Sequence, residues 1–402
     1  MKQLLKNMYI DKKRILLRCD FNVPLKNGNV LDETKIIKSL ETINYLLNKN
    51  CKIIILSHLG RIKTEEDLTK NSLKPVHEIL ERLLNKEVLF ANNILSPETE
   101  KMALSLKEGD ILLVENTRFL DLQNKGESTL NLDFAKTIAK LGELFVFDAF
   151  AVAHRSHTTV VGISKFLPSC LGFLAEKEIN MLNNSILKPI KPFTVIMGGA
   201  KVDDKLPIIK SLLPKCDNLL LSGGIANSFL YALGLDVGES LKTVDDTIIK
   251  ELKSLMLEYK TKFAFPLDTV TETKYNHIPT LKSINNLDPD DVIKDIGTKT
   301  IAKYSTIILK SNTIFINGTM GIYEESAFKN GTTEIFNALK NTTGKVVIGG
   351  GDTISALNNL GFNNTFENIS SGGGATLEYI ANETLPGIEA ISEEDNIEIL
   401  DF

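Results

Sequence analysis

The amino-acid sequence predicts an α/β protein with two doubly wound parallel-sheet domains, joined by an interdomain helix and a hinge. Short, continuously apolar segments alternate with segments whose apolar residues recur at helical spacing, a pattern typical of a parallel sheet covered by helices on both faces. This alternation stops between Pro168 and Pro192 and resumes afterwards. With 402 residues, the chain is also long for a single hydrophobic core.

The first half contains four predicted strands, each a run of mainly apolar residues, at 13–18, 52–56, 111–114 and 144–147. Apolar residues at helical spacing fill the intervals, most clearly at 34–47, 73–84 and 133–141. We therefore expect a first domain over residues 1–170.

A proline-bounded amphipathic segment, 172–186, reads as one helix that connects the two halves, and we assign 171–187 to it. The second domain is expected over 188–387, with strands at 193–197, 218–221, 262–265, 314–316, 345–348 and 365–369. The remaining residues, 388–402, are acidic and show no clear period, so by themselves they indicate a frayed terminus.

The composition excludes several classes of protein. A net charge of −5 gives no indication of nucleic-acid binding. The four cysteines are too far apart for a CxxC pair or a zinc site and are typical of reduced, buried thiols. The sequence begins without the features of a signal peptide and contains no apolar run that could span a bilayer. We expect a cytoplasmic protein that binds neither nucleic acid nor membranes.

Polar and cationic side chains follow the predicted strands of the first half. Ligands of open doubly wound sheets bind outside the carboxyl ends of the strands, and the residues found there are Asp20, Asn22, His58, Arg61, Arg118 and Arg155. Each arginine taken singly is explained as well by a solvated surface charge or a structural ion pair. Together they predict a site for a small polyanion, because guanidinium groups match phosphate and carboxylate geometry.

Glycine-rich turns follow the predicted strands of the second half, at 198–201, 222–224, 317–318, 349–353 and 371–375. The charged residues in or near these turns are Lys201, Lys205 and Asp352. One glycine triplet can be a tight connection without a ligand, and Asp352 can simply cap its helix. Two triplets in consecutive units favour a nucleotide polyphosphate site, in which Asp352 would hold magnesium through one carboxylate.

Other nucleotide and metal motifs do not fit. The sequence has no GxxxxGK[ST] or HExxH motif, and Ile354 stands where a dinucleotide fingerprint requires its third glycine. We interpret His77, His154, His157 and His277 as structural or hydrogen-bonding residues. A polyanion site on one domain and a nucleotide site on the other fit phosphoryl transfer, in which two anionic reactants stay apart until domain closure aligns them and excludes water.

These motifs resemble those of the phosphoglycerate kinase family. The match runs in order over nearly the whole chain, at 18–24, 57–61, 148–155, 198–202, 349–353 and 371–375. The resemblance implies a monomer with two Rossmann-like domains and a hinge, and a C-terminal tail, 388–402, that packs back on the N-terminal domain. It also implies reversible phosphoryl transfer in glycolysis between 3-phosphoglycerate and MgATP, giving 1,3-bisphosphoglycerate and MgADP.

The resemblance further implies roles for individual residues. Asp20 and Asn22 would hold the hydroxyl and carboxylate of phosphoglycerate, and its phosphate would be bound by His58, Arg61, Arg118 and Arg155. Lys201, Gly372 and Gly373 would contact the transferring phosphoryl group, the glycines through their main-chain N–H groups. Gly297 would lie at the base and Glu324 at the ribose. The full implied nucleotide set is Lys205, Gly297, Asn317, Glu324, Gly350, Gly351, Asp352 and Thr353, and Asp352 is also the implied Mg²⁺ ligand.

Lys35 is the largest departure from the family pattern, because it stands where the family has a catalytic arginine. Lysine keeps the charge but loses the guanidinium fork, and one lost charge-assisted hydrogen bond slows a reaction roughly ten- to a hundredfold. Two alternatives stay open: a non-catalytic paralogue that binds nucleotide or phosphoglycerate, and a small-molecule kinase with another acid acceptor. Smaller departures are Phe147, Ala151, Thr298 and Thr319.

Overall fold

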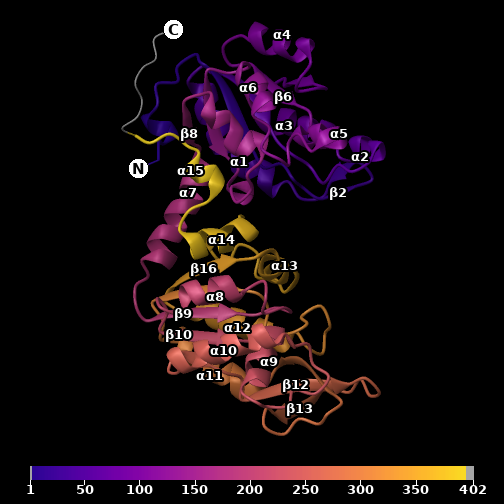
Figure 1. Cartoon of the computed structure of the whole chain (residues 1–402), viewed down its shortest axis with the longest axis vertical. Helices are drawn as coiled ribbons and strands as arrows, with labels where there is room; N and C mark the ends of the chain where they lie inside the picture. Colours follow the sequence, from indigo (N-terminus) through magenta and orange to yellow (C-terminus); the bar gives the residue numbers. More distant parts are fainter. Residues whose placement is uncertain (1, 395–402) are drawn as a thin grey trace. The chain divides into compact units, whose positions relative to one another are not determined.

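The computed structural model describes residues 2–394. Its internal contacts divide the chain into two compact units, and many of their helices and strands are labelled in Figure 1. Unit 1 contains the residues up to Ile179 and those from Thr384 onward, and unit 2 runs from Asn180 to Glu383. Each unit is built around a parallel sheet, so the predicted fold class is confirmed.

The sheet of unit 1 has six strands in the order β5-β6-β4-β1-β7-β8, and all its pairings are parallel. Its strands are β1 (Arg14–Cys19), β4 (Lys52–Leu56), β5 (Leu89–Ala91), β6 (Ile111–Val114), β7 (Leu144–Asp148) and β8 (Ser169–Leu171). The central strand β1 pairs on both sides, with Arg18 opposite Leu56 of β4 and Phe147 of β7. The carboxyl ends of three strands therefore meet beside Arg18.

Both faces of this sheet are covered, because successive side chains of a strand point to opposite faces. On one face, Ile15 and Leu17 of β1 belong to a core cluster that includes side chains of α1 (Thr34–Asn48) and α3 (Lys74–Leu84). The other face carries Arg18, which bonds to Thr159 in a π-helical turn (Thr158–Gly162). Further helices of the unit are α2 (Glu65–Lys70), α4 (Pro97–Ser105), α5 (Asp121–Asn124), α6 (Leu132–Ala139) and α15 (Pro386–Glu389).

The last described residues belong to unit 1. Gly387 N–H donates to Ala153 O over 2.8 Å, and Ser392 N–H donates to Ser169 Oγ over 3.0 Å. In Figure 1 this yellow segment runs alongside β8, in agreement with the Ser392 bond. These contacts replace the frayed terminus indicated by composition for 388–394, and the rest of the predicted tail, 395–402, lies outside the described residues.

Unit 2 contains a second six-stranded parallel sheet, in the order β11-β10-β9-β15-β16-β17. Its strands are β9 (Phe193–Met197), β10 (Asn218–Leu221), β11 (Phe263–Ala264), β15 (Thr313–Asn317), β16 (Lys345–Gly349) and β17 (Asn368–Ile369). The helices are α8 (Leu206–Leu212), α9 (Gly223–Ala232), α10 (Asp246–Glu258), α11 (Thr298–Leu309), α12 (Asn330–Asn341), α13 (Gly351–Asn359) and α14 (Gly374–Asn382). One core cluster joins the sheet to α11, α12 and α13.

Unit 2 also contains an antiparallel sheet that the sequence did not predict. It has the order β13-β12-β14 and consists of β12 (Asp268–Thr273), β13 (Thr280–Ser283) and β14 (Asp291–Ile296). The β12 sequence, DTVTET, contains one apolar residue, so no apolar run marks it. A short two-stranded hairpin in unit 1, β2 (Leu25–Lys26) and β3 (Asn29–Val30), was also not predicted.

The predicted connecting helix, 172–186, is α-helical over α7 (Phe173–Leu182) and continues as a π-helical turn (Asn183–Leu187). The division between the two units falls inside α7. Within residues 2–394, no helix has both the length and the apolar character needed to cross a bilayer.

Candidate active site

Asp20 directly follows β1, and its buried carboxylate has three polar neighbours. Lys35 Nζ, at the start of α1, donates to Oδ2 over 2.8 Å, and Asn22 N–H donates to Oδ1 over 3.1 Å. His58 Nδ1 lies 3.9 Å from Oδ1. Only 6% of Asp20 is exposed, so the hydrogen bonds from Lys35 and from Asn22 N–H compensate for the water that burial removes from its carboxylate.

The loop after β4 is bonded directly to the segment after β1. Gly60 N–H donates to the Asn22 side-chain oxygen over 2.9 Å, and Ser57 Oγ accepts from Phe21 N–H over 2.8 Å. Because β1 and β4 are adjacent parallel strands, their following loops leave the sheet at the same edge. The predicted residues Asp20, Asn22 and His58 are therefore brought together.

His58 is neutral at physiological pH. It is 4% exposed, and burial lowers its pKa well below the usual value. The nearby positive charges of Arg18, Arg118, Lys35 and Arg155 lower that pKa further. His58 can thus act as a hydrogen-bond donor or acceptor without adding a charge.

Arg118 lies in the short 3₁₀ turn (Thr117–Leu120) that follows β6. One of its terminal nitrogens, Nη1, donates to Gly60 O, which ties the β6 end to the loop after β4. Its buried Nε has no hydrogen-bond partner among the described residues. Burial, together with the charge of Arg155, lowers the pKa of Arg118. A buried guanidinium with an unused N–H group is suited to accept an anion.

Arg155 and Arg61 occupy different settings. Arg155 is partly buried, and its Nε donates to His154 Nε2 over 3.3 Å. Its positive charge lowers the pKa values of Arg118, His58 and His157. Burial, followed by the positive charges of Arg118, Arg18 and Arg155, lowers the pKa of His157 to about 3. Arg61 is exposed, and its side chain makes no ion pair or hydrogen bond with any residue in 2–394. Arg61 is thus the one predicted arginine that the structure does not tie to the group.

In unit 2, the end of β15 provides a buried amide beside a lysine. Asn317 is fully buried; its Oδ1 accepts from Lys205 Nζ, and its Nδ2 has no partner in the described part of the chain. Burial lowers the pKa of Lys205, and the negative charges of Asp352 and Asp204 oppose that shift. Lys205, Asn317 and Asp352 are therefore neighbours, as the nucleotide prediction requires.

Thr353 joins two of the glycine turns. Its buried hydroxyl accepts from Gly318 N–H over 2.7 Å and donates to Gly349 O over 2.9 Å. Gly350 adopts φ +92°, and a Cβ atom there would lie 2.6 Å from Asn317 Nδ2. Only glycine allows this backbone to approach Asn317 so closely.

The helices α13 and α14 start at the two glycine triplets. A Cβ atom at Gly351 or at Gly373, which has φ +55°, would meet nothing within 4 Å, so the space beside each helix start is open. Gly372 N–H donates to Ser370 Oγ over 3.3 Å. These helix starts present main-chain N–H groups and partial positive charge to an anion.

Magnesium fits the donor set at the start of α13. Asp352 is an exposed carboxylate in the first turn of that helix. Within residues 2–394, no group of three or more carboxylate, histidine or cysteine side chains is placed to hold a metal ion. Mg²⁺ is commonly held by one or two carboxylates together with substrate phosphates, and a single carboxylate beside an open glycine turn is compatible with that arrangement.

Three residues predicted for the nucleotide or the transferring phosphoryl group form no hydrogen bond or ion pair with Lys205, Asn317 or Thr353. Lys201 is exposed in the loop after β9, and its side chain forms no hydrogen bond or ion pair with another described residue. Gly297 precedes α11, where a Cβ atom would lie 2.4 Å from the Asp268 carboxyl carbon. Glu324 is exposed in the loop after β15, next to Tyr323, whose pKa is raised by burial with smaller contributions from Glu324 and Asp352.

The sequence analysis did not identify a buried set of hydrogen-bonded residues in unit 1, formed by Arg18, Thr159 and Glu127. Arg18 and Glu127 are both fully buried, and Thr159 lies between them. One signal was available: a charged residue interrupts the apolar run of a central strand at Arg18. The partners Thr159, in the π-helical turn, and Glu127, in the turn after α5, are far from Arg18 in the sequence and carry no sequence signal of their own.

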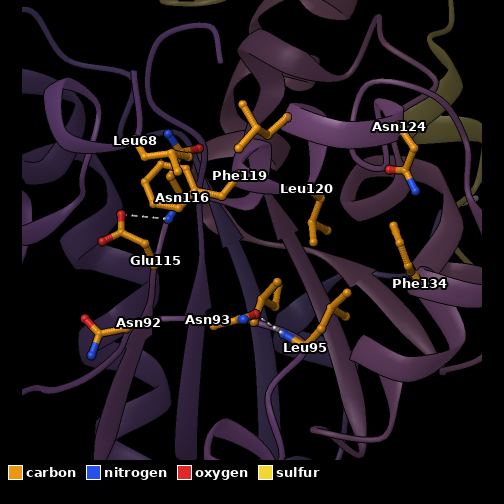
Figure 2. A pocket seen from close by; sticks show the side chains of 12 residues that line it. Leu68, Asn92, Asn93, Leu95, Glu115, Asn116, Phe119, Leu120, Asn124 and Phe134 are labelled. Atoms are coloured by element: carbon orange, nitrogen blue, oxygen red, sulfur yellow. Dashed lines mark hydrogen bonds between the residues drawn. The ribbon is translucent and has the colours of Figure 1, made fainter. Parts of the chain in front are cut away.

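A separate cavity of about 360 Å³ lies in unit 1 (Figure 2). Figure 2 shows Glu115 joined to Asn116 N–H, with Phe134 on the opposite side. None of the predicted site residues lines it. Asn116 nevertheless links the cavity to the site, because its Oδ1 accepts from Arg118 N–H over 3.0 Å.

Comparison with known proteins identifies the family. The family model described as "Phosphoglycerate kinase" matches residues 5–383. This chain belongs to the phosphoglycerate kinase family. Its relatives include the phosphoglycerate kinases of Listeria innocua serovar 6a, 40% identical over 396 residues, and of Lacticaseibacillus casei strain BL23, 42% identical over 398 residues. In both comparisons the match covers 98% of this chain and 100% of the relative.

Solved phosphoglycerate kinase structures share the fold. The enzyme from Coxiella burnetii is 32% identical with a TM-score of 0.87, and that from Pyrococcus horikoshii OT3 is 28% identical with a TM-score of 0.81. Each match covers 97% of this chain and 98% of the other. The resemblance inferred from the motifs is thus confirmed, and the roles of individual residues stay predictions.

Proposed function

We propose that the chain catalyses reversible phosphoryl transfer between 1,3-bisphosphoglycerate with ADP and 3-phosphoglycerate with ATP, with phosphoglycerate bound by unit 1 and the nucleotide by unit 2. Membership of the phosphoglycerate kinase family, matched over residues 5–383, is the observation that carries this proposal. It makes the chain a phosphotransferase with a carboxyl group as acceptor, acting in glycolysis.

We assign phosphoglycerate to unit 1. Its phosphate would be bound by Arg118, Arg155, His58 and Arg61, and its carboxylate and hydroxyl end would face Asp20 and Asn22. The buried, unpartnered Nε of Arg118 supports this assignment, because an anion would complete its hydrogen bonding. Neutral His58 adds a directional donor without increasing repulsion among the cations.

We assign the nucleotide to unit 2. Lys205 and the starts of α13 and α14 would neutralise its phosphates, with Asn317, Gly350, Gly351 and Thr353 shaping the turns. The base would lie at Gly297 and the ribose at Glu324. Asp352 would hold Mg²⁺, which supplies charge neutralisation on the phosphate oxygens when bound.

In the direction that consumes ATP, a carboxylate oxygen of 3-phosphoglycerate forms a bond to the γ-phosphorus, giving 1,3-bisphosphoglycerate. The bond from that phosphorus to the bridging oxygen breaks, and ADP keeps the electron pair. Lys201, Lys35 and the N–H groups of Gly372 and Gly373 would stabilise the charge on the moving group. In-line transfer requires the two ligands to meet directly, so the domain closure expected from the sequence is part of the proposal. We further propose a cytoplasmic monomer that acts on these small molecules without nucleic-acid or membrane partners.

A coupled assay with 3-phosphoglycerate and MgATP tests the reaction. We expect turnover above the no-enzyme control, and poor activity with glycerate, acetate or aspartate, because the arginine group requires a phosphate on the acceptor. No turnover with 3-phosphoglycerate would favour the non-catalytic alternative. Better activity with an unphosphorylated acid would favour a kinase with another acceptor.

The variant Arg118→Gln tests the phosphoglycerate site. Losing the guanidinium should raise KM for 3-phosphoglycerate roughly ten- to a hundredfold, the effect of one lost charge-assisted hydrogen bond, while KM for MgATP stays unchanged. Arg82→Gln is the matched control, because Arg82 forms a surface ion pair with Glu33 at 2.6 Å. Equal KM values in both variants would place the phosphate elsewhere.

A further inference from the structure

Arg18 is a fully buried cation on the central strand of unit 1. Its three nitrogens have separate partners: Nε donates to Thr159 Oγ1 over 2.9 Å, Nη1 donates to Cys19 O, and Nη2 lies 3.3 Å from His58 Nδ1. Burial lowers its pKa, and the charges of Glu127 and Asp20 oppose that shift. A buried charge of this kind requires a compensating anion nearby.

Glu127 supplies that anion through Thr159. Its Oε1 accepts from the Thr159 hydroxyl over 2.6 Å, and its Oε2 accepts from Thr159 N–H over 3.1 Å. Because Arg18 Nε can only donate, the single hydroxyl proton of Thr159 must point to Glu127. Both Glu127 oxygens therefore act as acceptors, the pattern of an ionised carboxylate. Burial raises the pKa of Glu127, and the charge of Arg18 and the two bonds from Thr159 oppose that shift and favour the ionised form.

The same reasoning sets the tautomer of His58. Arginine has no acceptor, so the contact between Arg18 Nη2 and His58 Nδ1 requires Nδ1 to accept. In a neutral imidazole the proton then resides on Nε2. The nearest carboxylate, Asp20, is 3.9 Å from Nδ1, beyond hydrogen-bond distance, and its Oδ2 is occupied by Lys35.

We propose that Glu127 and Thr159 are positioning residues that hold Arg18 in place and thereby fix His58 as the Nε2–H tautomer, which donates to the substrate phosphate. This inference rests on the proposed function of His58 as a phosphoglycerate ligand. Glu127 and Thr159 do not touch substrate in this scheme. They act by orienting two groups that the phosphoglycerate site needs.

Imidazole ¹⁵N NMR of the unmodified protein tests the tautomer directly. We expect His58 to show one unprotonated nitrogen, Nδ1, and one protonated nitrogen, Nε2, unchanged between about pH 6 and 8, where an ordinary histidine titrates. The groups facing His58 are Arg18, Asp20, Lys35, Arg118 and Arg155. The variant His58→Asn identifies the signals among the five histidines. A proton on Nδ1, or titration in this range, would overturn the inference.

Thr159→Val tests the positioning role, because valine keeps the shape and removes the hydroxyl. We expect KM for 3-phosphoglycerate to rise about tenfold, as for one hydrogen bond to a charged group. KM for MgATP should not change, and the His58 signals should show a mixture of tautomers. Thr159→Ser, which restores a hydroxyl, should recover wild-type values.

Thr99→Val is the matched control, since Thr99 is also buried and donates through its hydroxyl to Asn93 O over 2.5 Å. Thr99 forms no hydrogen bond with Glu127, Thr159, Arg18 or His58. It should lose stability without a change in either KM. If Thr159→Val fails to fold, the inference is still tested by the His58 tautomer of the unmodified protein and by the KM values of Thr159→Ser. An inactive wild-type enzyme would refute the proposed function itself, whereas an active enzyme with identical KM values in Thr159→Val and Thr99→Val would refute only the positioning role.

Discussion

At the scale of single residues, the site is organised by how each buried charge finds a partner. Asp20 is paired with Lys35 at 2.8 Å, and Arg18 reaches Glu127 through Thr159. Arg118, by contrast, keeps an unused buried N–H group. The protein thus satisfies the charges that shape the site internally and leaves a donor for a ligand.

Lys35→Arg should raise the turnover number about tenfold or more. A guanidinium can contact two oxygens of the moving phosphoryl group at once, whereas the ammonium of Lys35 is a point charge that is already bonded to Asp20. The measurement is kcat in the coupled assay. Lys49→Arg, at the other end of α1, should change nothing, and an unchanged or lower kcat in Lys35→Arg would mean that the site has re-formed around lysine.

At the scale of elements, the nucleotide site depends on sharp turns from strand to helix. The turn from β16 to α13 brings Gly350 against Asn317, and Thr353 bonds that turn to the one after β15. Such contacts are possible only where the backbone can take positive φ without a side chain. The helix starts are therefore positioned by glycine and by one threonine hydroxyl.

Gly350→Ala should impair nucleotide binding beyond its effect on stability. Positive φ costs an L-residue roughly 1–2 kcal/mol, and here the added Cβ would also lie 2.6 Å from Asn317 Nδ2. Asn317 and its bond to Lys205 must then shift, so KM for MgATP should rise. The measurements are KM for MgATP and the free energy of unfolding in urea.

Gly361→Ala is the control for this prediction. Gly361 has φ +82°, close to the +92° of Gly350, but a Cβ atom there would meet nothing within 4 Å. It should show the cost of positive φ alone, with KM for MgATP as in the wild type. If both variants bind MgATP equally well, the close approach to Asn317 does not matter for the nucleotide.

At the scale of the whole molecule, each unit has its own hydrophobic core and contains a buried carboxyl group with a raised pKa. Burial raises the pKa of Asp148, at the end of β7, to about 6, and that of Asp295, at the end of β14, to about 7. Asp148 Oδ1 accepts from Ala175 N–H over 3.1 Å at the start of α7, while Oδ2 has no partner in the described residues. Each such carboxyl group should make the free energy of unfolding fall as pH rises toward its raised pKa.

Asp148→Asn should remove part of that pH dependence. The folded protein binds a proton at Asp148 up to about pH 6, whereas the unfolded chain releases it near 3.8. Wild-type stability therefore falls as pH rises through this window, by about 3 kcal/mol from this group. Asparagine keeps the acceptor for Ala175 and carries no charge, so the variant should gain relative stability as pH rises.

Urea unfolding of both proteins at about pH 4 and about pH 7 measures this difference. The advantage of Asp148→Asn should be near zero at the lower pH and about 3 kcal/mol at the higher one. The exposed substitution Asp11→Asn should show no such trend. A constant difference across the range would mean that Asp148 titrates normally in the folded protein.

Much of the fold followed from patterning alone. The predicted strands 52–56, 111–114, 193–197 and 218–221 coincide with β4, β6, β9 and β10, because a short apolar run between turns has few ways to be buried other than as a central strand. The sheet β12–β14 escaped prediction because its buried positions are largely threonine and aspartate, satisfied by hydrogen bonds such as Thr271 Oγ1 to Asp291 Oδ1 at 3.2 Å.

By itself, the sequence determined the fold class, the family and which side chains leave the carboxyl ends of the strands, because apolar periodicity and local motifs are encoded within short segments. Only the tertiary structure decided which of those side chains act together. It ties Arg118 to Gly60 but leaves Arg61 exposed, and it brings Glu127 to Arg18 across a large sequence separation. Such contacts depend on burial and on distance in space, and local sequence patterns indicate neither for residues that are far apart along the chain.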